Sequence, residues 1–202
     1  MKTINSPDHI EDEWPLLRQR IIKGDEIAFT RLYSLFYQRL YHFSLSLVRV
    51  PDTAQEVVED VFTKLWINRS RITVIVNPSV YLYVAVKNQS LNRLATKAQE
   101  WRVAGLDETI ISVAAIGNDP FSRLVTAEML SRVNDAIERL PSRCKMVFKL
   151  VREDGLRYKE VAEILNISVN TIDVQMAIAV RRISESLGVA KNIRQKPFVK
   201  KK

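Results

Sequence analysis

Apolar side chains recur at steps of three and four residues along most of the chain, and this spacing limits the fold more than any other feature. Between residues 28 and 48 the spacing is followed by Phe29, Leu32, Phe36, Leu40, Phe43 and Leu47. A period near 3.6 places such side chains on one face of an α-helix. Similar stripes run through residues 51–69, 79–101 and 122–187. The sequence therefore predicts an all-α fold.

The helical pattern is interrupted once, over residues 103–122. This stretch holds two of the five glycines and one of the seven prolines, with no long amphipathic stripe. Such breaks are typical of linkers between domains. We predict a helical domain at 1–102, a linker at 103–122, a second helical domain at 123–190 and a basic tail at 191–202. Roughly the first 13 residues are expected to be flexible, since they lack an apolar core.

Positive charge is concentrated in the C-terminal part. Residues 1–140 hold 17 Lys/Arg and 17 Asp/Glu, whereas residues 141–202 hold 14 Lys/Arg and 6 Asp/Glu, which accounts for the net charge of +8. This asymmetry favours a polyanionic partner for the second domain, although the tail alone supplies six of the cations. The only cysteine, Cys144, is predicted to be a small core residue, as is typical of a reducing cytoplasm.

The stretch "YKEVAEILNISVNTIDVQM", residues 158–176, indicates two short helices separated by a tight turn. Asn166 tolerates the left-handed backbone that such a turn needs, and Ser168 can cap the second helix. The spacing of Ala162, Asn166 and Ile172 matches a DNA-binding helix–turn–helix. An ordinary pair of antiparallel helices is the alternative.

In a helix–turn–helix the start of the second helix enters the major groove, where Gln and Asn can pair with adenine and Val can meet a thymine methyl. Cations nearby would hold phosphates. Asp173 would repel them, and its role stays open. The residues predicted to contact DNA are Asn170, Thr171, Val174, Gln175, Ile178, Arg181, Arg182, Lys159 and Arg157.

The first domain has its own charge order. Residues 52–60 contain four acids and no base, and residues 64–102 contain seven Lys/Arg and one acid. Trp66, Tyr81, Tyr83 and Trp101 lie within the basic segment. Cations beside aromatic rings suit a single-stranded nucleic acid, although aromatic residues at helical spacing are more often core.

The ordered set of segments resembles a bacterial RNA polymerase sigma factor of the extracytoplasmic function (ECF) group, within the sigma-70 superfamily. The matching segments are "GDEIAFTRLYSLFYQRLYHFSLSLV", "DTAQEVVEDVFTKLWINR", "YLYVAVKNQSLNRL" and "LPSRCKMVFKLVREDGLRYKEVAEILNISVNTI". The sequence of these segments is also similar to sigma factors of the Bacteroidetes. The resemblance implies a region 2 domain followed by a region 4 domain.

The resemblance also implies roles for individual residues. Region 2 would dock on the clamp helices of the largest polymerase subunit through Glu56, Glu59, Asp60, Phe62, Leu65 and Trp66. The loop at 68–79 and the next helix would hold the opened minus-10 strand, with contacts from Tyr81, Lys87, Asn88 and Arg93. Region 4 would read the minus-35 duplex and meet the polymerase flap. Such sigma factors are commonly held by an anti-sigma factor.

The sequence departs from the family pattern at several positions. Many relatives carry Arg at the position of Lys87, Asp at Asn92, Arg at Ala95 and Gly at Asn166. A lysine lacks the two-pronged geometry of an arginine, so the implied minus-10 contacts differ in detail.

Two other classes of protein could carry the same helix–turn–helix. A one-component transcriptional regulator would use the same helix–turn–helix without docking on polymerase. A DNA-cutting enzyme would need a reactive centre, but the sequence shows no Cys/His metal spacing, Gly-rich phosphate loop or nucleophile beside a base. We therefore predict no catalytic residues, metal or cofactor, and a cytoplasmic protein.

Overall fold

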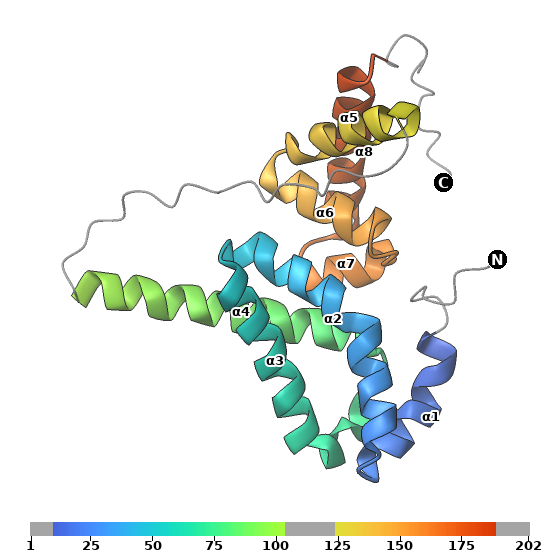
Figure 1. Cartoon of the computed structure of the whole chain (residues 1–202), viewed down its shortest axis with the longest axis vertical. Helices are drawn as coiled ribbons and strands as arrows, with labels where there is room; N and C mark the ends of the chain where they lie inside the picture. The colour runs from blue at the N-terminus through green and yellow to red at the C-terminus, as the bar shows by residue number, and fades with distance from the viewer. Residues whose placement is uncertain (1–9, 104–123, 189–202) are drawn as a thin grey trace, which may run out of the picture.

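The computed structural model describes residues 10–103 and 124–188, and every regular element within them is helical, as predicted (Figure 1). The N-terminal part contains α1 (Ile10–Ile22), α2 (Glu26–Val48), α3 (Pro51–Ile67), the 3₁₀ helix η2 (Arg69–Val74) and α4 (Pro78–Val103). The C-terminal part contains α5 (Leu124–Glu138), α6 (Ser142–Arg152), α7 (Tyr158–Leu165) and α8 (Val169–Ser186). Most of the predicted linker and the whole basic tail lie outside the described residues.

The sequence sets the ends of α2 through local interactions. The Asp25 carboxylate accepts hydrogen bonds from the backbone amides of Ile27 and Ala28, at 3.0 and 3.1 Å. These bonds satisfy two of the amides that lack a partner in the first turn of a helix. Arg49 ends α2 in the left-handed conformation, with φ 59°. Pro51 then occupies the first turn of α3, where its missing N–H has no cost.

Residues 10–13 lie in the segment expected to be flexible; in the structure α1 begins at Ile10, and Ile10 is buried. Trp14 is also buried, and its Nε1 donates to the carbonyl of Ile75 at 2.8 Å. Arg18 Nη1 donates to the carbonyls of Thr73 and Ile75 at 2.9 and 3.0 Å. Helix α1 therefore holds the segment between α3 and α4 in place.

Helices α2, α3 and α4 enclose the core of the N-terminal domain. Buried positions on α2 match the stripe expected from the sequence at Leu32, Phe36, Leu40 and Phe43. The hydroxyls of Ser44 and Ser90 lie 3.0 Å apart at the buried crossing of α2 and α4. Small side chains allow close approach there, and the mutual hydrogen bond satisfies both buried polar groups.

The C-terminal domain packs α6 and α7 against α8. Its core includes Val147, Leu150, Ile172 and Met176, and a second cluster joins α5 to α6 and α8 through Ile137, Leu140, Cys144 and Ala179. Cys144 is buried, as predicted, and its thiol donates to the carbonyl of Gln175.

The two domains touch in the structure. Helix α7 lies against α4 (Figure 1). Buried side chains of both domains belong to one continuous cluster. In the described ranges, no helix combines the length and the apolar character needed to cross a membrane.

Candidate nucleic-acid interface

The turn between α7 and α8 has the geometry that the sequence predicted. Asn166 adopts the left-handed conformation, with φ 54° and ψ 51°, and ends α7. Ser168 caps α8, because its Oγ accepts a hydrogen bond from the backbone amide of Thr171 at 3.1 Å. Ala162 and Ile172 are both buried at the crossing of the two helices. These contacts fix α8 relative to α7, as a recognition helix requires.

The start of α8 presents a polar surface. Asn170, Thr171 and Val174 are exposed, and Gln175 is half-buried on the same side. Val174 is 56% exposed, which leaves an apolar side chain open to a thymine methyl. The Thr171 hydroxyl lies 2.9 Å from that of Ser168, so the cap also orients one predicted base-contacting group.

Ile178 is less exposed than most of the predicted DNA-contacting set. It is half-buried and packs against the cluster formed by Ile137, Leu140, Cys144 and Ala179. An apolar side chain gains free energy from this packing, so Ile178 has a structural role in the free chain. Its contact with DNA stays a prediction.

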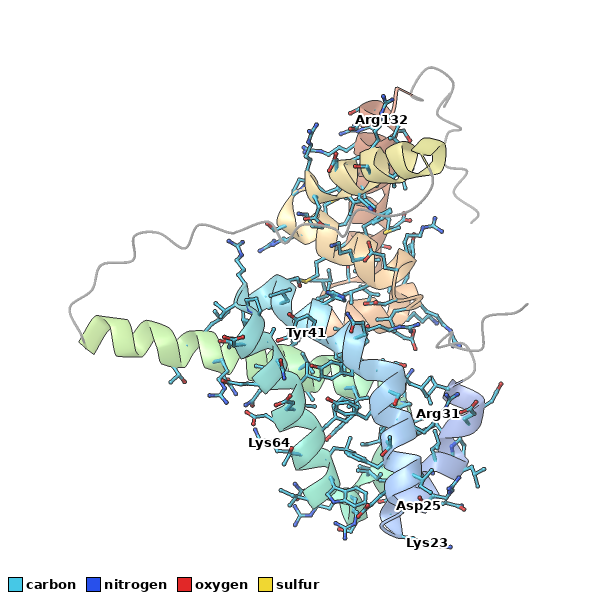
Figure 2. All side chains as sticks on the ribbon, viewed as in Figure 1. Lys23, Asp25, Arg31, Tyr41, Lys64 and Arg132 are labelled. Atoms are coloured by element: carbon cyan, nitrogen blue, oxygen red, sulfur yellow. The ribbon has the colours of Figure 1, made fainter. Side chains whose placement is uncertain are left out.

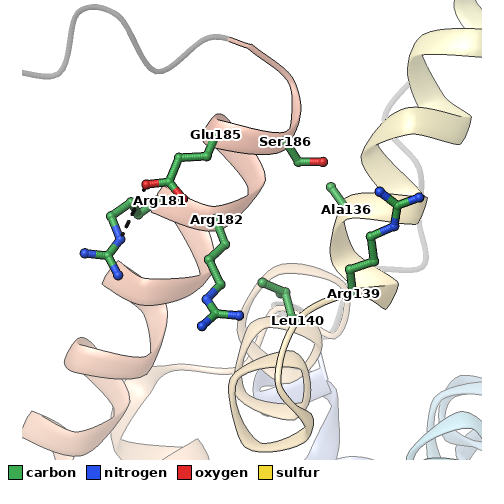
Figure 3. A pocket seen from close by; sticks show the side chains of 7 residues that line it. All are labelled: Ala136, Arg139, Leu140, Arg181, Arg182, Glu185 and Ser186. Atoms are coloured by element: carbon green, nitrogen blue, oxygen red, sulfur yellow. Dashed lines mark ion pairs between the residues drawn. The ribbon is translucent and has the colours of Figure 1, made fainter.

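The predicted phosphate-binding cations lie near the start of α7 and in the second half of α8. Lys159 and Arg157 are exposed near the start of α7. Arg181 and Arg182 lie about 16 Å along α8 from Thr171, from the rise of 1.5 Å per residue. They line a pocket with Arg139 of the α5–α6 turn, and Arg181 Nε lies 3.8 Å from Glu185 (Figure 3). The excess of positive charge suits a phosphate.

The acidic side of α3 is only partly as predicted. Glu56 and Glu59 are exposed, and Trp66 is half-buried with its ring centroid 4.8 Å from that of Phe29. Phe62 and Leu65, however, are 2% and 3% exposed and belong to the core. They cannot contact a polymerase directly, so the docking surface is reduced to Glu56, Glu59, Asp60 and Trp66.

Asp60 connects the acidic helix to the basic one. Its Oδ2 accepts hydrogen bonds from Arg93 Nη2 at 2.9 Å and from Gln89 Nε2 at 3.0 Å. Arg93 also lies 3.9 Å from Glu56. The Lys64 ammonium donates to Gln89 Oε1 at 3.0 Å. Lys64 is the labelled residue of α3 in Figure 2. The predicted polymerase-binding and DNA-binding sets therefore share one hydrogen-bond network.

The remaining predicted minus-10 residues lie along α4. Tyr81 is 42% exposed, and Asn88 is exposed about two turns further on. Lys87 is half-buried, because its Nζ donates to the carbonyl of Ile164 in α7 at 2.6 Å. Tyr83 is buried and serves the core.

The loop before α4 combines anchored and open side chains. Ile72 and Ile75 are buried, whereas Val74 and Val76 are 81% and 87% exposed. Apolar side chains held in solvent by a fixed backbone can pack against unstacked bases. The loop predicted to hold the opened strand is therefore anchored by its buried isoleucines and exposes its two valines to solvent.

Sequence reasoning missed two features. Arg139 lines the arginine pocket but follows α5 in sequence, far from the recognition helix. A ladder of tyrosines lies half-buried on α2, where the ring centroids of Tyr33 and Tyr37 stack at 5.0 Å and those of Tyr37 and Tyr41 at 6.3 Å. Tyr41 is labelled in Figure 2. Their spacing of four residues in "YSLFYQRLY" was the available signal.

Comparison with protein families agrees with the geometry. Residues 32–100 match the model of Sigma-70 region 2, and residues 130–190 match that of Sigma-70, region 4. Together these segments cover more than half of the chain.

Individual relatives extend the match across both domains. The ECF RNA polymerase sigma factor SigW of Bacillus subtilis is 23% identical over 164 residues, covering 78% of this chain and 88% of that protein. The ECF RNA polymerase sigma factor SigK of Mycolicibacterium vanbaalenii is 26% identical over 181 residues, covering 87% and 89%.

Two solved structures share the fold. One is the sigma factor RpoE in complex with the anti-sigma factor NepR from Bartonella quintana, with a TM-score of 0.61, 21% identity and coverage of 81% of this chain and 98% of that one. The other is CnrH in complex with the cytosolic domain of CnrY, with a TM-score of 0.55, 17% identity and coverage of 87% and 97%. The ordered pair of regions, joined to a helix–turn–helix of the expected geometry, shows that the chain belongs to the sigma-70 family as an ECF sigma factor.

Proposed function

We propose that this chain binds core RNA polymerase through the outer face of α3 and directs it to promoters through α4 and α8. The assignment rests on one observation above all, which is the order of surfaces along the chain. An acidic helix is followed by an anchored loop, a basic helix and a capped recognition helix. A one-component regulator has no need for the first three of these.

On the polymerase side, Glu56, Glu59, Asp60 and Trp66 form the docking surface. Clamp helices that carry basic side chains would complement three carboxylates on one helix face. The tyrosine ladder of α2 extends this surface, because Tyr33 and Tyr37 lie near Glu59. The flap of the polymerase would contact the region 4 domain.

On the DNA side, two domains read two elements. The loop at 68–79, with Tyr81, Lys87, Asn88 and Arg93, receives the opened minus-10 strand. Asn170, Thr171, Val174 and Gln175 read the minus-35 duplex, while Lys159, Arg157, Arg181 and Arg182 hold its phosphates. Extracting a base costs a few kcal/mol, which stacking and pocket contacts offset.

An anti-sigma partner is part of this proposal. The RpoE and CnrH structures are complexes with NepR and with the cytosolic domain of CnrY. A similar partner of this chain would cover the polymerase-docking or DNA-binding face. The chain would act in the cytoplasm, where its polymerase is found.

Reconstitution tests the proposal directly. The purified chain is mixed with core polymerase and genomic DNA fragments, and the run-off transcripts are mapped. A sigma factor produces transcripts with defined starts that depend on the chain. Transcription that is unchanged by the chain, or DNA binding without polymerase association, would favour the one-component regulator.

A further inference from the structure

Asp173 is an acid on the recognition helix, close to the residues proposed to read bases. Its side chain is exposed on α8, between the buried Ile172 and the exposed Val174. A carboxylate at a DNA surface repels the phosphates unless it pairs with a cation of the protein or accepts a hydrogen bond from a base. The contacts of Asp173 in the free chain distinguish these two possibilities.

No cation pairs with Asp173 in the part of the chain that the structure describes, whereas Glu138 and Glu185 both pair with cations of the same domain. Side chains three or four residues away along a helix are the nearest candidates for such a pair. At those positions α8 carries Val169, Asn170, Met176 and Ala177. The charge of Asp173 is therefore not neutralised within its own helix.

The stability of α8 does not explain an acid at this position. Carboxylates stabilise a helix through its dipole mainly in the first turn, and Asp173 is the fifth residue of α8. The backbone amide of Thr171 in the first turn already donates to Ser168 Oγ. Aspartate is also less favourable than alanine in the interior of a helix. The carboxylate therefore adds little to the stability of the free chain.

Asp173 lies at one edge of the exposed face of α8, and Gln175 lies at the other. Successive residues of a helix are rotated by about 100°, so these two side chains diverge by about 160° around the axis. Ile172 and Met176 are buried on the opposite side of the helix. Ala177, one turn further along from Asp173, is exposed and small, which leaves space beside the carboxylate for the edge of a base.

An ionised carboxylate distinguishes the four bases in the major groove, because it can only accept hydrogen bonds. Guanine presents two acceptors there, and thymine presents an acceptor and a methyl group. Adenine presents an amino donor beside the N7 acceptor, whereas cytosine presents its N4 amino donor. Cytosine is therefore the best match for Asp173, and guanine or thymine in its place would leave the carboxylate without a donor.

We propose that Asp173 is a specificity-determining residue, which accepts a hydrogen bond from the N4 amino group of a cytosine in the minus-35 duplex. This inference rests on the proposed function of region 4. The carboxylate repels the phosphates of every duplex alike, and only a correctly placed cytosine offsets the repulsion. Asp173 thus weakens the binding of wrong sequences, whereas Arg181 and Arg182 hold the phosphates of any sequence.

Selection of duplexes by the full chain with core polymerase tests the assignment. A promoter found by reconstitution with genomic DNA is randomised over its minus-35 segment, and the selected duplexes are sequenced. The wild-type chain should favour cytosine over guanine or thymine at one position by about tenfold or more. Asp173→Ala should remove this preference at that position alone. Asp173→Asn should move the preference to adenine, because an asparagine amide pairs with N6 and N7 of adenine.

Asp135→Asn is the matched control, because Asp135 is exposed on α5 of the same domain and the charge change is identical. It should leave every base preference unchanged. If Asp173→Ala loses helical circular dichroism, Asp173→Asn decides, since it keeps the shape of the side chain. Unchanged selection by the Asp173 variants would overturn the proposal, and so would a change that Asp135→Asn reproduces.

The outcomes separate this assignment from the promoter-directing function. A wild-type chain that enriches no minus-35 sequence in the presence of core polymerase rejects both. A wild-type chain that enriches a defined sequence, with no position controlled by Asp173, rejects the assignment of Asp173 alone.

Discussion

Acidic pH should favour the arrangement in which α7 lies against α4, which we call the closed form, through the carboxyl of Asp154. Burial raises the pKa of its carboxyl from the ordinary value of 3.8 to about 6, which outweighs the lowering by the Tyr83 hydroxyl and the Arg39 guanidinium. Lys149 lowers this pKa and Glu153 raises it, both more weakly. A carboxyl with a raised pKa binds its proton more tightly in the closed form than in an open, solvated one. Closing is therefore favoured as pH falls through about 6, and the gain is complete below 3.8.

The size of the effect follows from these two values. Between pH 7.5 and pH 5 the closed carboxyl gains most of a proton and the open one gains almost none, which amounts to about 1.4 kcal/mol. The ratio of closed to open chain should rise about tenfold.

Spin labels at Thr63 and Val180 would measure this ratio as a distance distribution, because both side chains are exposed and lie on opposite domains. The native Cys144 should not take label, since it is buried and burial raises the pKa of its thiol. The Glu160→Ala background removes the hydrogen bond that Asn77 Nδ2 donates to Glu160 Oε1 at 2.7 Å between the domains, so that both populations can be counted. Asp154→Asn is the control, because it cannot titrate and should show no such change. A distribution that does not respond to pH, or responds equally in Asp154→Asn, refutes the reasoning.

Four further outcomes are expected. Trp14→Phe should lower the free energy of unfolding by about 1–3 kcal/mol, since it removes the donor to Ile75 and leaves a small void; an unchanged urea midpoint would contradict this. Asn166→Ala should cost about 1 kcal/mol because of its φ of 54°, and Asn166→Gly should cost nothing. Glu59→Lys should reduce co-purification with core polymerase, whereas Asp52→Lys, at the exposed start of the same helix, should not. Gln175→Ala should lower promoter preference in gel shifts, whereas Arg182→Ala should weaken binding to promoter and scrambled duplexes alike; equal losses for Gln175→Ala would exclude base reading.

The helix–turn–helix could be predicted because its determinants are local. The left-handed turn at Asn166 and the cap at Ser168 depend on neighbours within four residues, and both were confirmed. The buried stripe of α2 could also be predicted, because the spacing of apolar residues along one helix determines it. Membership of the ECF sigma factors followed from the order of several weak segments. The Bacteroidetes affinity stays a prediction.

Features that depend on distant partners were not predictable in the same way. Helix α1 was missed because acids and Pro15 obscure its apolar positions, and its burial depends on a loop some 60 residues later. Helix α4 begins at Pro78 and Asn77 caps it, as a proline in the first turn favours. Leu65 was placed in the docking set by family resemblance, although its own helical stripe already marked it as core.

The carboxylate of Asp60 joins the two surfaces proposed for region 2. Its ion pair with Arg93 occupies, in the free chain, a guanidinium proposed to contact DNA with a carboxylate proposed to contact polymerase. Under the proposed function, a basic side chain of polymerase that took over Asp60 would release Arg93 toward the strand. Docking would then supply a cation for strand capture.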